Sequence, residues 1–178
     1  MVALVTRAEL ASHLQVPQVF NDAADLAIAA ASAYVEGKTG LAFTVRTATI
    51  VLPSSRDREI PIPLRPARAV TAVSIGGTAY TDARLTAAGT IYRALGWRST
   101  YEPEDVLVTV QYGLTTTPDD IKGVVLELAG ARYEGHLGVE SEQIDDYRVA
   151  YSSTLSQTSL VTLANYGADV GALSMSGR

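Results

Sequence analysis

The stretch that most constrains the fold is a helix signal that begins at Thr117 and reads TPDDIKGVVLELAGARYEG. Thr117 is a suitable cap, proline is tolerated in a first turn, and Asp119 and Asp120 place negative charge at the positive end of the helix dipole. Apolar residues then recur every three or four positions, which buries one side of the helix. These residues are Ile121, Val124, Val125, Leu128 and Ala131. The sequence therefore predicts a firm helix start and one buried side.

Two glycines, Gly123 and Gly130, lie on the opposite side of this predicted helix, together with Glu127 and Glu134. Each glycine in a helix interior costs about 1 kcal/mol relative to alanine. One interpretation is that another backbone, such as that of a second copy of the chain, packs over them. The other is that the surrounding contacts simply tolerate them, and the sequence leaves both open.

Two further helices are predicted before residue 41. The capping-box pattern at residues 6–9 starts a short helix that Pro17 ends. A second helix runs from an Asn21 cap to about Lys38, and Gly40 lies just beyond its end. The first part of the chain is therefore helical.

The second predicted helix carries small side chains nearly all round. Seven alanines lie between residues 23 and 33. Small residues let neighbouring helices approach closely, which is typical either of a central helix or of one shared between subunits. If it is shared, we expect the subunit interface at Ala27, Ala30, Tyr34, Gly123 and Gly130.

Between these helices and Thr117 the apolar residues follow a period of two. Residues 43–52 and 106–112 are rich in β-branched side chains and are predicted strands. The dipeptide Gly76-Gly77 is typical of a two-residue hairpin turn, and we expect one more short strand at residues 90–93. A cluster of prolines restricts residues 59–64 to a sheet edge. The segment 43–113 is thus predicted to be an antiparallel β insertion.

After the central helix, residues 144–151 alternate imperfectly, which indicates a short or edge strand. Leucines and a tyrosine then predict a last short helix that ends at Gly167. Residues 168–178 have little to bury, so we expect the tail of residues 152–178 to be partly flexible.

The predicted fold class is α+β, in a single domain of residues 1–178. Two N-terminal helices, one long central helix and a short C-terminal helix form a helical frame. The antiparallel β subdomain is inserted into that frame.

Composition excludes several functions. The formal net charge is −5, and the basic cluster that binding to nucleic acid phosphates requires is missing. Cysteine is absent, which excludes disulfides, zinc fingers and thiol chemistry. The start of the sequence lacks the layout of a signal peptide, and no apolar run approaches the roughly 18 to 20 residues of a membrane span. We therefore expect no membrane association.

No catalytic, cofactor or metal site is predicted. His13 and His136 lack a second ligand at metal spacing, and neither GxSxG nor GxxxxGK[ST] occurs. One acidic cluster follows the central helix. One interpretation is a surface that repels or guides charged groups or weakly holds a divalent cation, and the other is a solvated loop. Its members are Glu140, Glu142, Asp145 and Asp146.

An ordered set of motifs resembles the head-to-tail adaptor proteins of long-tailed bacteriophages, also called head completion or connector proteins. The matching stretches are LVTRAELASHL, AAASAYVEGKTGLAF, PDDIKGVVLELAGARYEG, GVESEQIDDYRVAY and LSQTSLVTLANY. Together they cover nearly the whole chain, and the ordered set is more specific than any single motif. Asp145-Asp146 departs from the small residue expected there.

This resemblance implies a ring, usually dodecameric, between the portal protein and a stopper or head-closure protein in the neck of the virion. DNA would pass through the ring without specific binding, and the subunits would be made in the host cytoplasm. We expect the acidic cluster to face that channel. We expect the C-terminal segment to dock on the portal through Leu155, Leu160, Leu163 and Tyr166.

Two alternatives remain from the sequence. One is another ring component of the neck or tail, such as a stopper or a tail terminator, although these are expected to be dominated by β-barrel. The other is a small enzyme or ligand-binding domain with its pocket in the β insertion. That reading requires a convergent cluster of titratable groups.

Overall fold

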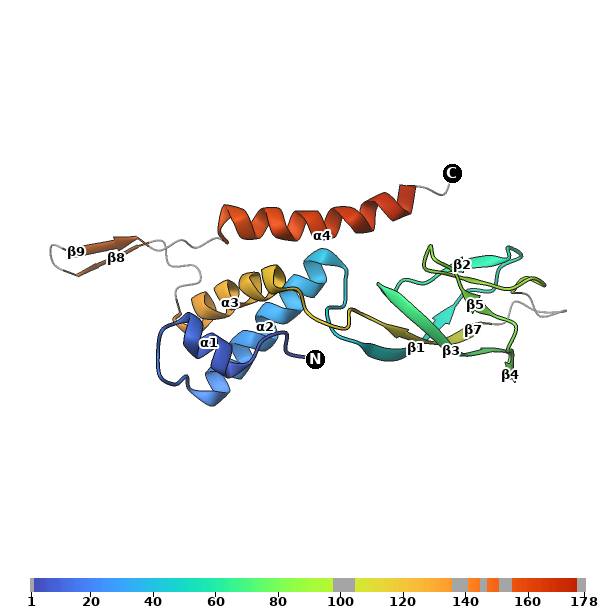
Figure 1. The fold of residues 1–178 in the computed structure, drawn as a ribbon, viewed down its shortest axis with the longest axis horizontal. Helices are drawn as coiled ribbons and strands as arrows, with labels where there is room; N and C mark the ends of the chain where they lie inside the picture. Colours follow the sequence, from blue (N-terminus) through green and yellow to red (C-terminus); the bar gives the residue numbers. More distant parts are fainter. Residues whose placement is uncertain (1, 98–104, 136–140, 145–146, 151–154, 176–178) are drawn as a thin grey trace. The chain divides into compact units, whose positions relative to one another are not determined.

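The computed structural model describes residues 2–97, 105–135, 141–144, 147–150 and 155–175 (Figure 1). This part of the chain contains four α-helices and nine short strands, all of them paired antiparallel. The predicted α+β fold class is therefore confirmed. The chain forms two compact units, which we call the helical unit (residues 1–40 and 117–178) and the β unit (residues 41–116).

The helical unit starts with α1 (Arg7–His13) and α2 (Asn21–Thr39). The predicted capping box is present: the Glu9 amide donates to Thr6 Oγ1 at 3.2 Å, and the Thr6 amide donates to Glu9 Oε2 at 2.6 Å. The prediction that Asn21 caps α2 was wrong by one residue, because Phe20 holds the extended cap position. Gly40 ends α2 in the left-handed conformation, as expected.

The other helices are α3 (Asp119–Tyr133) and α4 (Gln157–Met175). Pro118, not Thr117, occupies the cap position of α3, a shift of the size that is common at helix ends. Helix α4 is much longer than predicted, because it continues through Gly167. A Cβ at Gly167 would lie 3.7 Å from the carbonyl oxygen of Lys38, so this glycine packs against the end of α2 and does not stop the helix.

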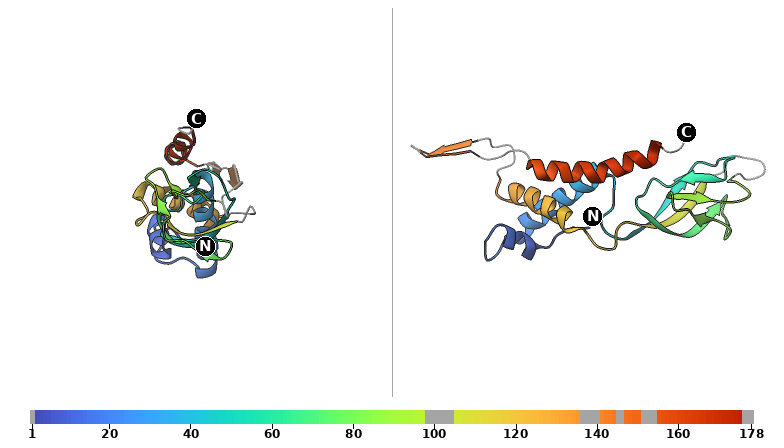
Figure 2. Two further views of the ribbon diagram at one scale, coloured as in Figure 1. Left: turned by 90° about the vertical axis from the view of Figure 1, so that its right-hand side faces the viewer. Right: turned by 45° about the horizontal axis from the view of Figure 1, so that its top comes forward.

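The apolar side predicted for α3 is buried, apart from the half-buried Ala131. It packs against α2, whose Ala24, Ile28, Ala31 and Val35 are buried too. Helices α1 and α4 each pack on this α2–α3 pair (Figures 1 and 2). The helical unit is thus a central helix pair with two covering helices.

The β unit contains two antiparallel sheets. The first has the order β1-β7-β3-β4 and the second the order β2-β6-β5. The strands are β1 (Arg46–Leu52), β2 (Glu59–Pro61), β3 (Ala67–Ile75), β4 (Thr78–Ala79), β5 (Arg84–Leu85), β6 (Thr90–Tyr92) and β7 (Val106–Tyr112). The expected hairpin at Gly76-Gly77 joins β3 to β4, and both glycines have positive φ.

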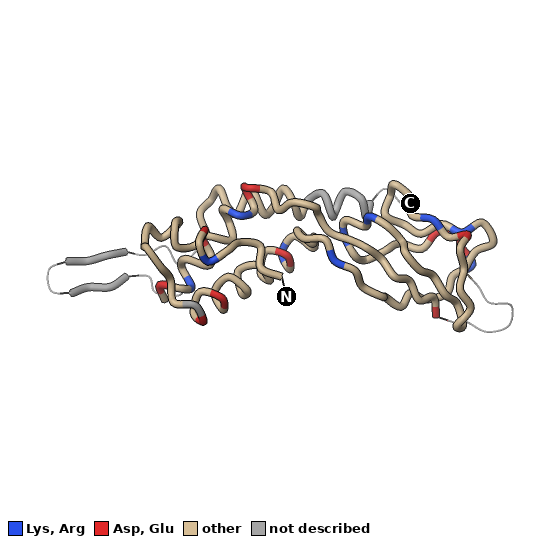
Figure 3. The backbone as a smooth tube through the Cα atoms, turned by 60° about the horizontal axis from the view of Figure 1, so that its bottom comes forward, with Lys and Arg blue, Asp and Glu red and all other residues tan. Residues whose placement is uncertain are grey.

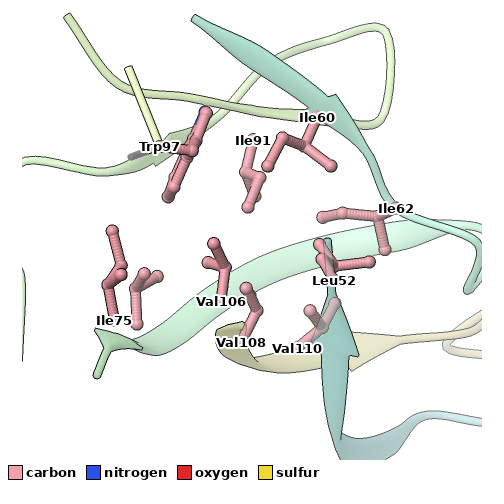
Figure 4. Packing of buried hydrophobic residues seen from close by; sticks show 10 residues of the cluster. Leu52, Ile60, Ile62, Ile75, Ile91, Trp97, Val106, Val108 and Val110 are labelled. Atoms are coloured by element: carbon pink, nitrogen blue, oxygen red, sulfur yellow. The ribbon is translucent and has the colours of Figure 1, made fainter. Parts of the chain in front are cut away.

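The core of the β unit lies between the inward faces of the two sheets. In Figure 4, Ile60 and Ile91 of the second sheet lie opposite Val106, Val108 and Val110 of β7. Trp97 is fully buried beside them, and its Nε1 donates to the Arg58 carbonyl at 3.0 Å. The β unit therefore has a core of its own.

Between α3 and α4 the chain forms a hairpin of β8 (Ser141–Ile144) and β9 (Tyr147–Ala150). The sequence predicted only one strand here. Residues 141–144 form a strand as well, paired antiparallel with residues 147–150. Ser141 lies opposite Ala150, and Ile144 lies opposite Tyr147.

Candidate functional site

The described residues contain no group of three or more His, Asp or Glu placed to share a metal ion. None of the helices in the described ranges is long and apolar enough to cross a membrane. Among the described residues Arg93 is the most buried charged side chain, and its partners explain it as part of the fold. It pairs with Asp82 at 2.9 Å, donates to the Gly96 carbonyl and lies 4.0 Å from the Tyr80 ring centre. The candidate functional features are therefore surfaces of the two units.

A groove of about 400 Å³ lies on the helical unit between α2 and the end of α3; we call it the α2 groove. Four residues of α2 form one wall, because positions three and four apart share a helix face. They are Ala23, Leu26, Ala27 and Ala30. Arg132, Tyr133 and Gly135 form the other wall. Two of the predicted interface residues, Ala27 and Ala30, thus line a real concavity.

Large apolar side chains are exposed on the same face of α2. Leu26 is 73% exposed, Phe20 is 83% exposed at the start of the helix, and Tyr34 is 37% exposed two turns further along. The Phe20 amide donates to the Tyr133 hydroxyl at 2.9 Å, which holds the start of α2 to the wall supplied by α3. The groove is therefore preformed and mostly apolar, with Arg132 as its single charged lining residue.

The two α3 glycines of the predicted interface lie outside this groove. A Cβ on Gly130 would be 3.2 Å from Leu14 Cδ2 and 3.6 Å from the His13 ring, so α1 of the same chain accounts for this glycine. Gly130 is buried, not on an open side as predicted. Gly123 is exposed, and within the described structure nothing lies within 4 Å of its Cβ position.

Helix α4 is fixed to α3 at its first turn by Glu127. Its carboxylate accepts hydrogen bonds from the Ser156 amide at 2.6 Å, the Ser156 hydroxyl at 3.0 Å and the Ser159 hydroxyl. Partial burial raises the pKa of Glu127, but the bonds from Ser159 and Ser156 outweigh this effect, so the pKa lies below its usual value. The carboxylate therefore stays charged at the positive end of the α4 dipole.

Most of the residues predicted to dock on the portal instead pack within the helical unit. Leu163 is buried, and Leu155 and Tyr166 are half-buried. The Tyr166 hydroxyl donates to the Asp120 carboxylate at 3.1 Å, and burial followed by this bond raises its pKa. Leu160 instead faces outward, 44% exposed, beside Val161, which is 49% exposed.

The acidic cluster falls largely outside the described residues, which is where Glu140, Asp145 and Asp146 lie. Glu142 belongs to strand β8 and not to a loop, which corrects the sequence prediction for this residue. In this strand Glu142 lies opposite Val149 of the hairpin.

The paired positions on the outward face of the first sheet of the β unit form a second surface, and they are uncharged; the exposed Arg68 lies in a bulge of β3 and is not among them. Cross-strand pairing puts nine residues on this surface: Thr47, Thr49, Val51, Ala69, Ala72, Ser74, Leu107, Thr109 and Gln111. The Thr49 and Thr109 hydroxyls bond across it at 2.9 Å. In Figure 3 the long strands are tan over most of their length, and coloured positions gather at strand ends and loops. A solvated sheet face usually carries charged residues, so this face suits a protein contact.

Sequence reasoning found the small-residue face of α2 but not the groove. Its second wall comes from residues about a hundred positions later, and no periodic pattern links the two segments. The exposure of Phe20 and Leu26 depends on how α3 packs against α2, so it was missed for the same reason.

Comparison with known proteins gives fold matches only. No protein-family profile matches the chain, and no curated protein does so either. A chain of the virion of a native gene transfer agent particle matches with a TM-score of 0.65 and 22% identity, over 92% of this chain and 89% of that one. A chain from the neck of the empty particle, computed with C6 symmetry, matches with a TM-score of 0.67, 20% identity and coverage of 92% and 88%.

A third match is a chain from the neck of the native particle, computed with C12 symmetry. Its TM-score is 0.65 at 19% identity, over 93% of each chain. Because both chains are covered almost completely in all three cases, the shared fold includes the helical and the β unit.

Proposed function

We propose that this chain is a structural head-to-tail adaptor of a tailed phage or phage-like particle. In this role it forms a ring in the virion neck that joins the portal to the stopper or tail and lines the DNA channel. The observation that carries the proposal is the fold match to neck chains over about nine tenths of both lengths. A match of that extent concerns the whole subunit and not a common helical motif.

Ring formation is supported by the C6 and C12 symmetry under which the similar necks were computed. A cyclic ring needs two different surfaces on each subunit, because each copy contacts the next in a head-to-tail manner. We assign Ala27, Ala30 and Tyr34 to one of these surfaces. The open position of Gly123 makes it a further candidate for contact between copies.

For portal docking we propose the last part of α4, residues 168–175. The chain before this segment already uses Leu163 and Tyr166 for its own packing. The segment itself is helical and contains a single charged residue, Asp169. The outward face of the first sheet of the β unit is proposed as a second contact with neck proteins.

For the DNA channel we propose a lumen without specific contacts. The net charge of −5 disfavours phosphate binding, and the acidic cluster at residues 140–146 would keep DNA from adhering. A ring structure with a basic lumen would contradict this part of the proposal.

The proposal is tested by light scattering on the purified protein, first alone and then with portal rings from the same particle. We expect a ring-sized species, or a mass increment on the portal that corresponds to a full ring. A chain that stays monomeric and leaves the portal mass unchanged at high concentration would contradict the adaptor function.

A further inference from the structure

We propose that the outward face of α4, with Leu160 and Val161, binds in the α2 groove of the next copy of the chain. This inference rests on the proposed function, and it deepens it by naming the two surfaces that meet between neighbouring subunits. The partner is therefore a second copy, and the contact is head-to-tail.

The receiving surface is concave and apolar. Small side chains of Ala27 and Ala30 form its floor, while Leu26 stands 73% exposed at its side. Exposed large apolar groups that surround a concavity are typical of binding surfaces. The width left by the alanines is what lets another helix approach α2 closely.

The inserting surface is convex and equally uncharged. Leu160 and Val161, at consecutive positions of α4, are 44% and 49% exposed. Over its 19 residues α4 has one charged residue, Asp169. A helix with a solvated face normally carries charged residues there, so the composition of α4 indicates that its outer face is covered in the working assembly.

The two surfaces do not meet within one chain. Among the described residues, none of α4 lines the α2 groove. The bonds of Glu127 to Ser156 and of Asp120 to Tyr166 fix α4 on the helical unit, with Leu160 and Val161 turned outward. A ridge and a groove on the same helical unit, each without its complement, satisfy the requirement of a cyclic ring for two different faces.

The absence of native cysteine makes a direct cross-linking test possible. The variant A30C/V161C, treated with a flexible bis-maleimide at assembly concentration, should give a ladder of multimers. Each single variant should give no ladder, and an equal mixture of A30C and V161C should stop at dimers. The matched control S12C/V161C moves one thiol to an exposed site on α1 and should give no ladder.

Variants that block the contact test it without a cross-linker. A30E places a charge in the groove and V161E places one on the ridge; circular dichroism verifies that both remain folded. Each should lose ring formation, whereas their mixture should give dimers, because one intact groove and one intact ridge remain. Rings or portal binding in the wild type together with unchanged assembly of A30E and V161E would overturn this inference and leave the adaptor function standing. A wild type that neither assembles nor binds the portal would overturn both.

Discussion

Among single residues, Gly113 is the one whose replacement should most affect the β unit. Its φ is +102°, and a Cβ there would lie 2.0 Å from the Thr44 carbonyl oxygen. Backbone strain and overlap each contribute on the order of 1 to 3 kcal/mol, so G113A should lower the stability of the β unit by about 3 kcal/mol or more. Urea unfolding followed by Trp97 fluorescence measures this loss.

The matched control is G123A in α3, where nothing in the described structure lies within 4 Å of the added Cβ. Alanine should raise the stability of the helical unit by up to about 1 kcal/mol, because it lowers the entropy of the unfolded chain. Equal effects of G113A and G123A would show that the close contact at Thr44 does not decide stability. A G123A protein that is stable but assembles poorly would place Gly123 in the subunit interface.

The Glu127 carboxylate should make the attachment of α4 sensitive to pH. Its folded-state pKa is lowered, so its contribution to stability is present above the unfolded pKa and is lost as pH falls through the folded one. Below about pH 4 the protection factors of the α4 amides, which are corrected for the intrinsic exchange rate at each pH, should therefore fall in the wild type. The difference from E127Q isolates this effect, since Glu9 and Asp25 also have lowered pKa values in the fold.

D22N is the control variant, because Asp22 is an exposed carboxylate on α2. Hydrogen exchange of the α4 amides in D22N should keep the pH dependence of the wild type. If E127Q shows the same acid response as the wild type, the bonds to Ser156 and Ser159 do not hold α4 through the charged form of Glu127.

The helices show how much of the fold the sequence alone predicts. Caps and apolar spacing predicted α2, α3 and the start of α1 to within a residue or two, because these signals are local. The end of α1 was placed too late, since the helix ends at His13 and not at Pro17. Gly167 misled the prediction for α4: a glycine that ends a helix and a glycine that packs against another helix look alike in sequence. Strand β5 was missed since Arg84–Leu85 is too short to show a period of two.

Removal of residues 168–178 should separate folding from portal docking. The truncated chain keeps the contacts of Ser159, Leu163 and Tyr166, so its thermal midpoint by circular dichroism should change little. Binding to portal rings should be lost. Retention of full portal binding would exclude the last part of α4 as the docking segment.

For the α2 groove, local sequence patterns predicted only the wall that α2 supplies. The alanines of α2 mark a surface of close approach in any fold. The other wall and the ridge on α4 depend on tertiary packing, which sets the positions of Tyr133, Leu160 and Val161. Single-sequence patterns contain no information on such contacts between distant segments.

Over the whole molecule, the two units should unfold as separate transitions. Each has its own core, and Trp97 is the only tryptophan, so its fluorescence reports the β unit alone. Far-ultraviolet circular dichroism mainly reports the helical unit. G113A should shift the fluorescence midpoint and leave the dichroism midpoint in place. A common shift of both midpoints would mean that the units unfold as one.

The adaptor function is tested most directly by electron microscopy of the neck of the particle that contains this chain. We predict a ring of copies between the portal and the stopper, with the DNA channel along its axis and the outer face of α4 against the α2 groove of the neighbouring copy. Particles made without the chain should have filled heads that lack tails. Normal joining of heads to tails in its absence, or density for the chain elsewhere in the particle, would contradict the account.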